Sequence, residues 1–250
     1  LFPGMVCLGH FYTERNSMRM KLLASGKRFA GLALLSVVCV VVYALLRLFN
    51  QNTYYDFLIW NLFLAWIPYV LSSVAAILHE RSTSVPRLAL TVIGIVWILF
   101  LPNAPYIVTD MIHLTILKSN YTAEGHLGLG FSYWNDFMVI MLFAWNGLLL
   151  GAVSMHQWHA ILRVRTSSQV SWVCAALVSF LSAYGILLGR EYRLNSWDLL
   201  TNPASIGRSV VDSLHPEALL FCGMFGLFIF AVYAMVYLLM SSAKHASSRL

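Results

Sequence analysis

The sequence predicts an all-α, polytopic integral membrane protein with about six transmembrane helices. Of its 250 residues, 60% are hydrophobic and 10% are charged, and the mean hydropathy is +0.74. Soluble domains carry about 25% charged residues, so water is not the main solvent of this chain. A membrane-spanning helix needs about 20 mainly apolar residues, and several stretches reach that length without Asp, Glu or Lys.

Five of the six expected helices are full-length apolar runs: 29–48, 57–78, 137–155, 170–188 and 218–240. The third is shorter, because the apolar run 88–101 holds 14 residues before Pro102 and Pro105. Proline removes an amide donor and disfavours helix in the preceding residue. Unpaired backbone groups at membrane depth are tolerated only where protein or a water-filled cavity covers them. We therefore expect the third helix to end irregularly, with residues 101–106 buried by its neighbours.

The chain divides into a short N-terminal segment, one membrane domain and a short tail. We expect residues 1–28 to be cytoplasmic, 29–240 to form a single six-helix domain and 241–250 to be a cytoplasmic tail. Residues 1–17 are compatible with an upstream extension, because Met18 and Met20 precede basic residues and the first apolar run. That run fills a whole span and lacks a small-residue cleavage pattern, so we interpret it as a retained helix.

The distribution of charge predicts the orientation in the membrane. With the N-terminus inside, eleven of the 16 Lys and Arg lie on the cytoplasmic side, and eight of the ten Asp and Glu lie outside. Cytoplasmic loops carry an excess of Lys and Arg, so both termini are expected in the cytoplasm. The net charge of +6 then reflects helix ends near anionic lipid. Nucleic acid is not an expected partner, because the basic residues form no patch interleaved with aromatic side chains.

Two polar strings interrupt the apolar background with residues that are costly near a membrane. The first is LPNAPYIVTDMIHL at 101–114, and the second is GREYRLNSWD at 189–198. Both strings follow helices that run outward on the predicted topology, so they reach the same membrane boundary. Asp136 opens the fourth helix at that boundary too. We therefore expect one polar pocket there, opening outward.

These strings resemble the motifs LPNxPYxxTDxxHL and GRxxRxNSWD of the bacterial membrane proteins grouped as domain of unknown function 1361 (DUF1361). The two ungapped strings occur in matching order, and the resemblance covers roughly residues 55–240. It implies a multi-spanning protein of the bacterial inner membrane. It carries no established activity, so the chemistry has to be argued from the residues themselves.

The polar residues at this boundary are of types that transfer protons or bind ions. Candidate catalytic residues are three carboxylates and an imidazole: Asp110, His113, Asp136 and Asp198. Candidate substrate-binding residues are Asn103, Tyr106, Arg190, Arg193 and Asn195. Carboxylates and histidine act as acids and bases or bind metal ions, and arginine grips phosphate or carboxylate. Cofactor use is therefore open, with a divalent cation as the candidate.

A structural role explains the same charges. Asp110 and Asp198 can cap helix starts, or they can pair with Arg190 and Arg193 and hold the loops against the bundle. Asp110 and His113 are three residues apart, as are the two arginines, so each pair shares a face wherever the chain is helical. Structural ion pairs also occur away from active sites, so both interpretations stay open.

Residues inside the helices have simpler interpretations. We interpret His156 and His159 as residues of the cytoplasmic interface beside Trp158. Asn146 lies in mid-span and is expected to hydrogen-bond to another helix. Tyr184 is interpreted as an aromatic of the bundle, with the pocket as its alternative position. Glycines spaced four apart are expected to permit close helix packing: Gly147, Gly151, Gly185 and Gly189.

Three functions are compatible with these observations. The first is a membrane-embedded enzyme that acts on an envelope or lipid-linked substrate at the outer face. The second is a transporter of a small solute, and the third is an assembly or scaffold factor without catalysis. Transporters place ionisable residues near the bilayer midplane, and the predicted helix interiors lack them. This absence favours a site at the membrane surface. The expected partner of the protein is the lipid bilayer.

Overall fold

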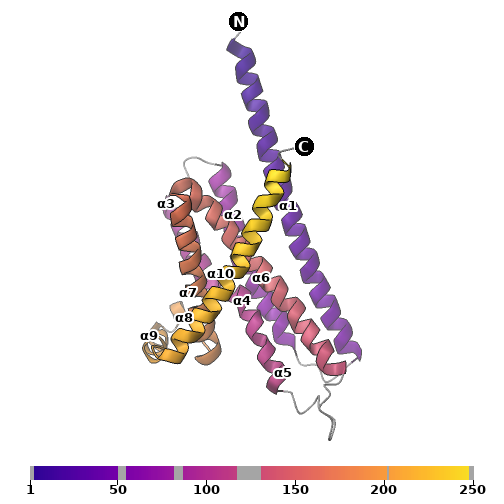
Figure 1. Ribbon diagram of the computed structural model, residues 1–250, viewed down its shortest axis with the longest axis vertical. Coiled ribbons are helices and arrows are strands. Elements are labelled where there is room, and N and C mark those ends of the chain that lie inside the picture. The colour runs from indigo at the N-terminus through magenta and orange to yellow at the C-terminus, as the bar shows by residue number, and fades with distance from the viewer. Residues whose placement is uncertain (1–2, 50–54, 82–86, 117–130, 202, 248–250) are drawn as a thin grey trace.

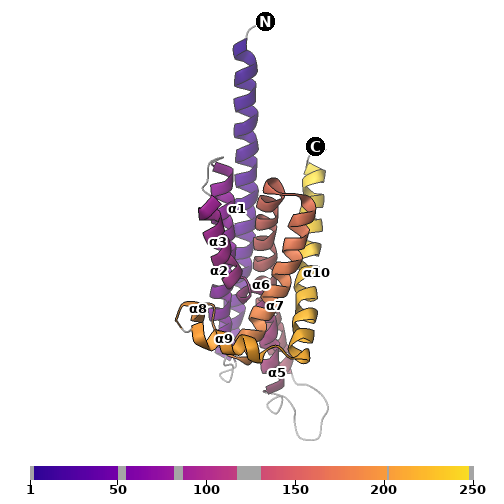
Figure 2. The ribbon, with the colours of Figure 1, turned by 90° about the vertical axis from the view of Figure 1, so that its left-hand side faces the viewer.

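The computed structural model of the protein describes residues 3–49, 55–81, 87–116, 131–201 and 203–247, and the regular elements of these ranges are helical. Six stretches within them are long and apolar enough to cross a membrane: Ser25–Leu48, Asp56–Glu80, Leu88–Thr115, Tyr133–Arg165, Ser168–Glu191 and Pro216–Ser242. The predicted class, an all-α polytopic membrane protein, is confirmed. Successive spans run in opposite directions, so both termini lie at one end of the bundle (Figures 1 and 2).

Five long helices form the bundle: α1 (Pro3–Phe49), α2 (Asp56–Arg81), α6 (Phe131–Arg165), α7 (Ser168–Glu191) and α10 (Pro216–Ser247). We call the end with both termini the terminal end, and the opposite end, with the short helices α5, α8 and α9, the far end (Figure 1). Helix α6 is central, because it packs against α1, α2, α7 and α10. It also extends well beyond the predicted 137–155 in both directions. Helix α7 starts where Ser167 caps it, its hydroxyl accepting from the Val170 amide at 3.2 Å.

The third span is broken in the way that its prolines predict. Helix α3 (Arg87–Phe100) ends in a turn at Leu101 and Pro102, and α4 (Asn103–Tyr106), a 3-10 turn η1 (Ile107–Met111) and α5 (Ile112–Ile116) follow. Leu101, Ala104 and Pro105 are buried. The expected irregular end is therefore confirmed, and the expected burial holds for these three residues, whereas Pro102, Asn103 and Tyr106 are half-buried. The span also continues further than expected, since residues up to Thr115 are apolar enough to lie in the membrane.

The broken segment packs between α6 and α7 at positions where both helices carry glycine. These positions are Gly147 and Gly151 on α6 and Gly185 and Gly189 on α7. A Cβ atom on Gly147 would collide with the carbonyl oxygen of Ala104, and one on Gly185 would lie 2.6 Å from Cγ of Pro102. Neither position has space for a side chain. The expected role of the four glycines in close packing is confirmed.

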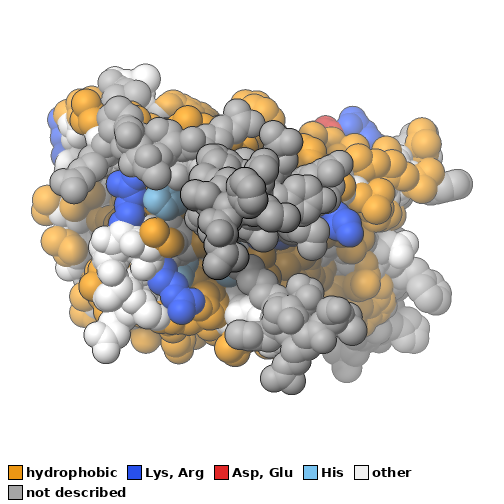
Figure 3. Space-filling model, turned by 90° about the horizontal axis from the view of Figure 1, so that it is seen from above, with side chains coloured by type: hydrophobic (Ala, Val, Ile, Leu, Met, Phe, Trp, Pro, Cys, Tyr) orange, Lys and Arg blue, Asp and Glu red, His pale blue; other side chains and the backbone are white. Residues whose placement is uncertain are grey.

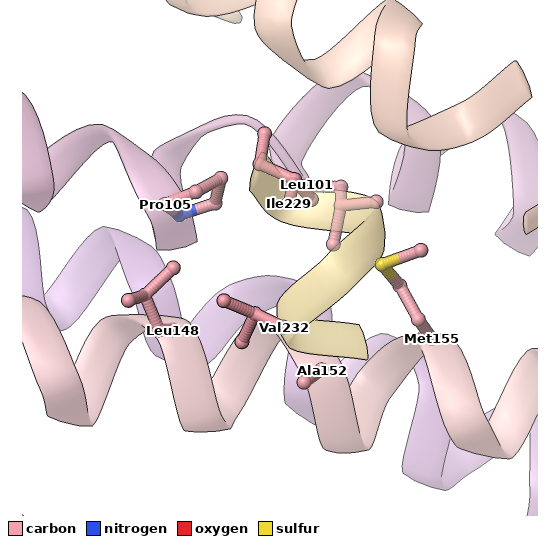
Figure 4. A pocket seen from close by; sticks show the side chains of 8 residues that line it. Leu101, Pro105, Leu148, Ala152, Met155, Ile229 and Val232 are labelled. Carbon is pink, nitrogen blue, oxygen red and sulfur yellow. The ribbon is translucent and has the colours of Figure 1, made fainter. Parts of the chain in front are cut away.

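On its α10 side, the broken segment borders a small apolar cavity of about 10 Å³. Side chains of Leu101 and Pro105, of Leu148, Ala152 and Met155 on α6, and of Ile229 and Val232 on α10 surround it (Figure 4). A cavity needs about this volume to hold one water, and a water there also needs polar partners. The contact between α6, α10 and the broken segment is therefore effectively filled.

Buried polar side chains tie the helices together in mid-span. The Asn146 amide donates to the Ser36 hydroxyl on α1 at 2.7 Å, which confirms the predicted interhelical bond. The Ser154 hydroxyl donates to the Pro68 carbonyl on α2 at 2.9 Å and accepts from the Trp97 indole on α3 at 2.6 Å. Hydrogen bonds thus link helix α6 to α1, α2 and α3. Lipid chains have no donors or acceptors that could take the place of these partners.

The outer surface of the bundle is largely apolar, and its charges lie at the two ends. Large exposed side chains include Leu34, Val92, Leu177, Leu227 and Leu238. Seen from the terminal end, Lys and Arg side chains appear among the hydrophobic ones (Figure 3). Lys27, Arg163 and Arg165 are exposed there. Such a surface suits a bilayer, in which apolar side chains meet lipid and charges reach the interface.

We expect the substitution Gly147→Ala to destabilise the protein. Its new methyl group would collide with the Ala104 carbonyl, and overpacking of this kind costs on the order of 1 to 3 kcal/mol. Thermal unfolding of the purified protein in detergent measures the effect. Gly223→Ala on α10 is the matched control: nothing lies within 4 Å of its added Cβ, so the better helix propensity of alanine should leave the melting temperature equal or higher. Equal melting temperatures for both variants would contradict the close packing.

Candidate functional site

A buried ion pair joins the two polar strings at the far end. Nη2 of Arg190, in the last turn of α7, donates to Oδ1 of Asp110 in η1 at 2.5 Å. The Asp110 side chain is 1% exposed and that of Arg190 is 20% exposed. The other carboxylate oxygen, Oδ2, accepts from the Asn61 amide on α2 at 2.8 Å. Three separate elements therefore meet at one carboxylate.

Further contacts hold the arginine. Nε of Arg190 donates to the Thr109 hydroxyl at 2.9 Å, and its guanidinium carbon lies 4.3 Å above the centre of the Tyr106 ring. The Thr109 hydroxyl in turn donates to the Tyr106 carbonyl at 2.6 Å. A buried ion pair is stable only when further hydrogen bonds satisfy both partners, and this one has them. The expected convergence of the two strings is therefore confirmed for Asp110 and Arg190.

A second bond links the strings beside the ion pair. The Asn103 amide donates to the Ser196 hydroxyl at 2.9 Å and to the Phe100 carbonyl, also at 2.9 Å. Phe100 is the last residue of α3, so its carbonyl is one that the break deprives of a helical partner. Asn103 therefore compensates the end of α3 and anchors the loop after α7 at the same time.

The remaining polar residues of the second string bind within their own loop. The Asp198 carboxylate accepts from the Asn195 backbone amide at 2.6 Å and from the Asn195 side chain at 3.3 Å. Asp198 is also the first residue of α8 (Asp198–Thr201), where a carboxylate is favoured by the helix dipole. Its described partners are Asn195 and the Thr201 hydroxyl, and they do not bring it to Asp110.

Arg193 adopts a backbone conformation that favours glycine. Its φ of 54° lies in the left-handed region, where a side chain costs about 1 kcal/mol or more. The Leu194 amide donates back to the Leu188 carbonyl at 3.2 Å, so the chain folds back on the end of α7, where glycine is the usual residue with a positive φ. Arg190 and Arg193 therefore do not share a face. The first points to Asp110, and the second lines a cavity.

His113 and Asp136 lie in neighbouring but separate surroundings. Nδ1 of His113 lies 2.9 Å from the Asp110 carbonyl oxygen, and its ring stacks on Phe57 with centroids 4.3 Å apart. Asp136 is buried on α6 and accepts from the Tyr55 hydroxyl at 3.1 Å. Within the described ranges, no three His, Cys, Asp or Glu side chains gather as metal ligands would. The divalent cation stays a prediction.

A cavity of about 450 Å³ opens at the far end between α2, α3, α4 and α7. Its polar lining comprises Asn61, Asn103, Tyr106, Tyr184, Arg193, Asn195 and Ser196. Its apolar lining includes Trp60, Leu64, Ile98, Leu99, Leu181, Leu188 and Ile206, the last from α9 (Pro203–Asp212). Among the described residues that line it, Arg193 alone carries a charge. The volume lies in the range of small-molecule sites.

Three site residues are absent from the sequence-based candidates. Asn61 binds Asp110 and lines the cavity, Thr109 binds Arg190, and Ser196 joins the loop to Asn103. Asn61 carries a signal that could have identified it, since it is a polar residue in an otherwise apolar span. Tyr184 occupies its alternative position at the cavity, with its hydroxyl 2.8 Å from that of Ser213.

The interfacial interpretation of His156 and His159 is wrong. Both side chains are buried. Nδ1 of His159 lies 2.6 Å from the Tyr233 hydroxyl, and its ring lies against Trp172 and Tyr237. The reason is that α6 continues to Arg165 and carries these residues into its contact with α7 and α10. They form an aromatic core near the terminal end, away from the far-end cavity.

One comparison with known proteins assigns a family. The sequence model of a family described as "Protein of unknown function (DUF1361)" matches residues 60–232. This range contains both polar strings and the parts of α2, α3 and α7 that line the cavity. No match was found among curated proteins or among solved structures. The comparisons thus assign a family and no activity.

We expect each single removal of a charge, Asp110→Ala or Arg190→Ala, to cost on the order of 3 to 5 kcal/mol of unfolding free energy, because the other charge is left buried without its partner. The double variant should recover much of that loss. Unfolding in denaturant and protein abundance in cells measure both effects.

The chain offers a matched control in the ion pair of Arg47 and Asp56, whose side chains are 54% and 61% exposed. Exposed pairs contribute about 0 to 1 kcal/mol, so Arg47→Ala should change stability little. Asp56 is left in place, because its carboxylate also accepts from the hydroxyl of buried Tyr43 at 2.7 Å. Equal losses at the two pairs would contradict the special position of Asp110 and Arg190.

Proposed function

The chain belongs to the DUF1361 family, whose description names no activity, and we propose from the far-end cavity that it binds the anionic headgroup of a lipid or lipid-linked substrate. The bound group would sit against Arg193, and the apolar part of the same molecule would lie between α2, α3 and α7. A guanidinium is the side chain best suited to phosphate and carboxylate, which it can contact through two parallel hydrogen bonds.

The observation that carries this proposal is the conformation of Arg193. Glycine would end α7 with less strain, because it adopts a φ of 54° freely. The arginine at this position therefore costs stability. It lines the cavity, and none of the ion pairs formed among the described residues includes it. Residues held in strained conformations cluster at functional sites. A negatively charged ligand would give the Arg193 guanidinium an ionic partner, which the described residues do not provide.

The two kinds of lining support an amphipathic ligand. The polar residues of the cavity come mainly from the broken third span and from the loop after α7, such as Asn103 and Asn195. The apolar ones come from the membrane-spanning helices, such as Leu64, Ile98 and Leu181. Lipids carry the same division between headgroup and chain. A freely soluble anion would gain nothing from the apolar half.

The ion pair supports binding more directly than catalysis. Asp110 lies behind Asn61 and Tyr106, which line the cavity, and both of its carboxylate oxygens already accept hydrogen bonds. We propose that Asp110 and Arg190 position this wall. An enzyme acting on the bound lipid would need a proton-transfer group in the cavity, and the described titratable residues that line it are Tyr106, Tyr184 and Arg193.

A small-solute transporter is the second candidate, and the interrupted third span favours it. Transporters build their sites from discontinuous helices, as α3 and α4 are here. A solute path would also need polar walls towards the terminal end. A second cavity, about 250 Å³ between α3, α6 and α7, lies nearer that end and has mainly apolar walls. This lining supports lipid binding over solute passage.

We propose that both termini are cytoplasmic and that the far-end cavity faces the outer side of a bacterial inner membrane. The basic residues Lys27, Arg163 and Arg165 lie at the terminal end, whereas the acidic Glu191, Asp198 and Asp212 belong to the far end. An excess of positive charge marks the cytoplasmic side. The bacterial location rests on the family resemblance alone.

We expect Arg193→Gly to separate stability from binding. Removing the left-handed strain should raise the unfolding free energy by about 1 kcal/mol, while loss of the guanidinium should abolish headgroup binding. The measurement is the melting temperature of the detergent-purified protein with and without dioctanoyl phosphatidate, because a ligand that binds the folded state raises it. Dioctanoylglycerol tests the need for the phosphate, and inorganic phosphate tests the need for the chain.

Arg208→Ala, which removes a positive charge from α9 outside this cavity, should keep the full shift produced by phosphatidate. A shift that persists in Arg193→Gly would contradict the proposed headgroup site. A lower melting temperature of Arg193→Gly without ligand would favour the scaffold alternative. An equal shift with inorganic phosphate would identify a free anion instead of a lipid.

For the orientation, we expect a cysteine at Asp212 to react with a membrane-impermeant maleimide added outside intact cells, and a cysteine at Arg165 to react only after permeabilisation. Both positions are exposed, so access depends on the side of the membrane. The native cysteines should be replaced by alanine first. The reverse labelling pattern would overturn the topology.

A further inference from the structure

One face of α7 continues from the far-end cavity to the other end of the helix. Its residues recur at spacings of three and four: Ser171, Cys174, Val178, Leu181, Tyr184 and Leu188. Such spacing places them in one stripe along a helix. The last three line the far-end cavity, and the first three line the second cavity of about 250 Å³.

The two cavities meet at α3. Ile98 lines both of them, and it is followed in the far-end cavity by Leu99 and preceded in the second cavity by Trp97. Both cavities therefore lie between the same two helices, α3 and α7, and Ile98 stands where one gives way to the other. We call the two cavities, with the wall at Ile98 that they share, the α3–α7 groove.

The α3–α7 groove is nearly as long as the hydrocarbon layer is thick. From Ser171 to Leu188 the stripe rises about 26 Å at 1.5 Å per residue, and the hydrocarbon core of a bilayer measures about 30 Å. Its charged side chain, Arg193, lies at the far end, just beyond Leu188. The groove thus has one cationic end and a long apolar course.

We propose that the α3–α7 groove holds the hydrocarbon chain of the anionic lipid whose headgroup binds at Arg193. This inference rests on the proposed function and adds the chemical class of the ligand, a long-chain lipid that reaches from one membrane interface towards the other. The second cavity suits methylene groups, because its walls are mainly apolar. Nδ1 of His159 is bonded to Tyr233, whereas Nε2 of His159 and Nε1 of Trp158 are buried without a hydrogen-bond partner among the described residues.

The groove acts by shape more than by hydrophobicity. A chain in the bilayer is already surrounded by apolar groups, so moving it into the protein gains only van der Waals packing. The headgroup therefore provides most of the affinity. The groove fixes where the chain runs and excludes lipids whose chains do not fit between α3 and α7.

Photo-crosslinking tests the course of the chain in the full-length protein, reconstituted in phosphatidylcholine nanodiscs. Two long-chain phosphatidate probes carry a diazirine either next to the glycerol or at the chain end. We expect the first probe to label α7 around Leu181 and Leu188, and the second to label it around Cys174 and Val178. Peptide mass spectrometry locates the labels.

The variant Ile98→Trp should block the passage between the cavities. Labelling of Cys174 and Val178 by the chain-end probe should fall by about tenfold or more, since overfilling a packed site carries a penalty of that size. Labelling by the headgroup-side probe should persist. Ile95→Trp is the matched control, because Ile95 is exposed on the outer surface of α3 and should leave both patterns unchanged.

Two failures are distinguishable. If the headgroup-side probe labels the cavity no better than a matching phosphatidylcholine probe, or labels Arg193→Gly equally well, the proposed headgroup site is wrong. If headgroup-side labelling holds but the chain-end probe labels the lipid-facing Val173 and Leu177 as strongly as Cys174 and Val178, the chain lies in bulk lipid. That result would overturn the groove and leave the headgroup site intact.

Discussion

The buried ion pair between Asp110 and Arg190 sets the conditions for the rest of the far end. Removing two ions from water costs several kcal/mol for each ion, and mutual attraction compensates only when every remaining hydrogen-bonding group also finds a partner. Asn61 and Thr109 supply those partners. They come from different elements, so the pair can exist only in a bundle that brings the third span, α2 and the end of α7 together.

That meeting depends on the path of the third span. In a continuous helix, Pro102 and Pro105 would leave two carbonyls without backbone donors, because proline has no amide hydrogen. In the broken chain, short turns and the side-chain amide of Asn103 supply hydrogen bonds instead. The turns need space, which Gly147 and Gly185 provide. The prolines, the glycines and the ion pair are therefore one structural unit, in which each part is useful only beside the others.

Sequence predicted this unit in outline, because its determinants are local. The spans follow from apolar length, the break follows from a short run before Pro102, and the convergence follows from the cost of unpaired charge at a membrane. The different positions of Arg190, which pairs with Asp110, and Arg193, which lines the cavity, could not be predicted in the same way. Helical spacing places both on one face, but α7 ends at Glu191, and only the left-handed backbone of Arg193 turns its side chain elsewhere.

Local sequence patterns also could not predict which residues of other helices contact a given side chain. The spacing of His156 and His159 shows that they share a helix face, yet it does not show that α6 continues beyond them and buries that face against Tyr233 and Tyr237. Asn61 illustrates the converse case, since its polarity marks it as unusual without naming Asp110 as its partner. Periodicity identifies faces, and only the packed structure identifies neighbours.

The two helix ends at the cavity have an electrostatic consequence. Helix α3 ends at Phe100 and α7 at Glu191, so the C-termini of both helices lie at the far-end cavity. Each helix C-terminus carries a partial negative charge of about half an elementary charge. The backbone alone would therefore favour a cation, and among the described residues that line the cavity Arg193 supplies the positive charge. A chain with glycine at position 193 would keep this fold, end α7 without strain and present a site of the opposite sign.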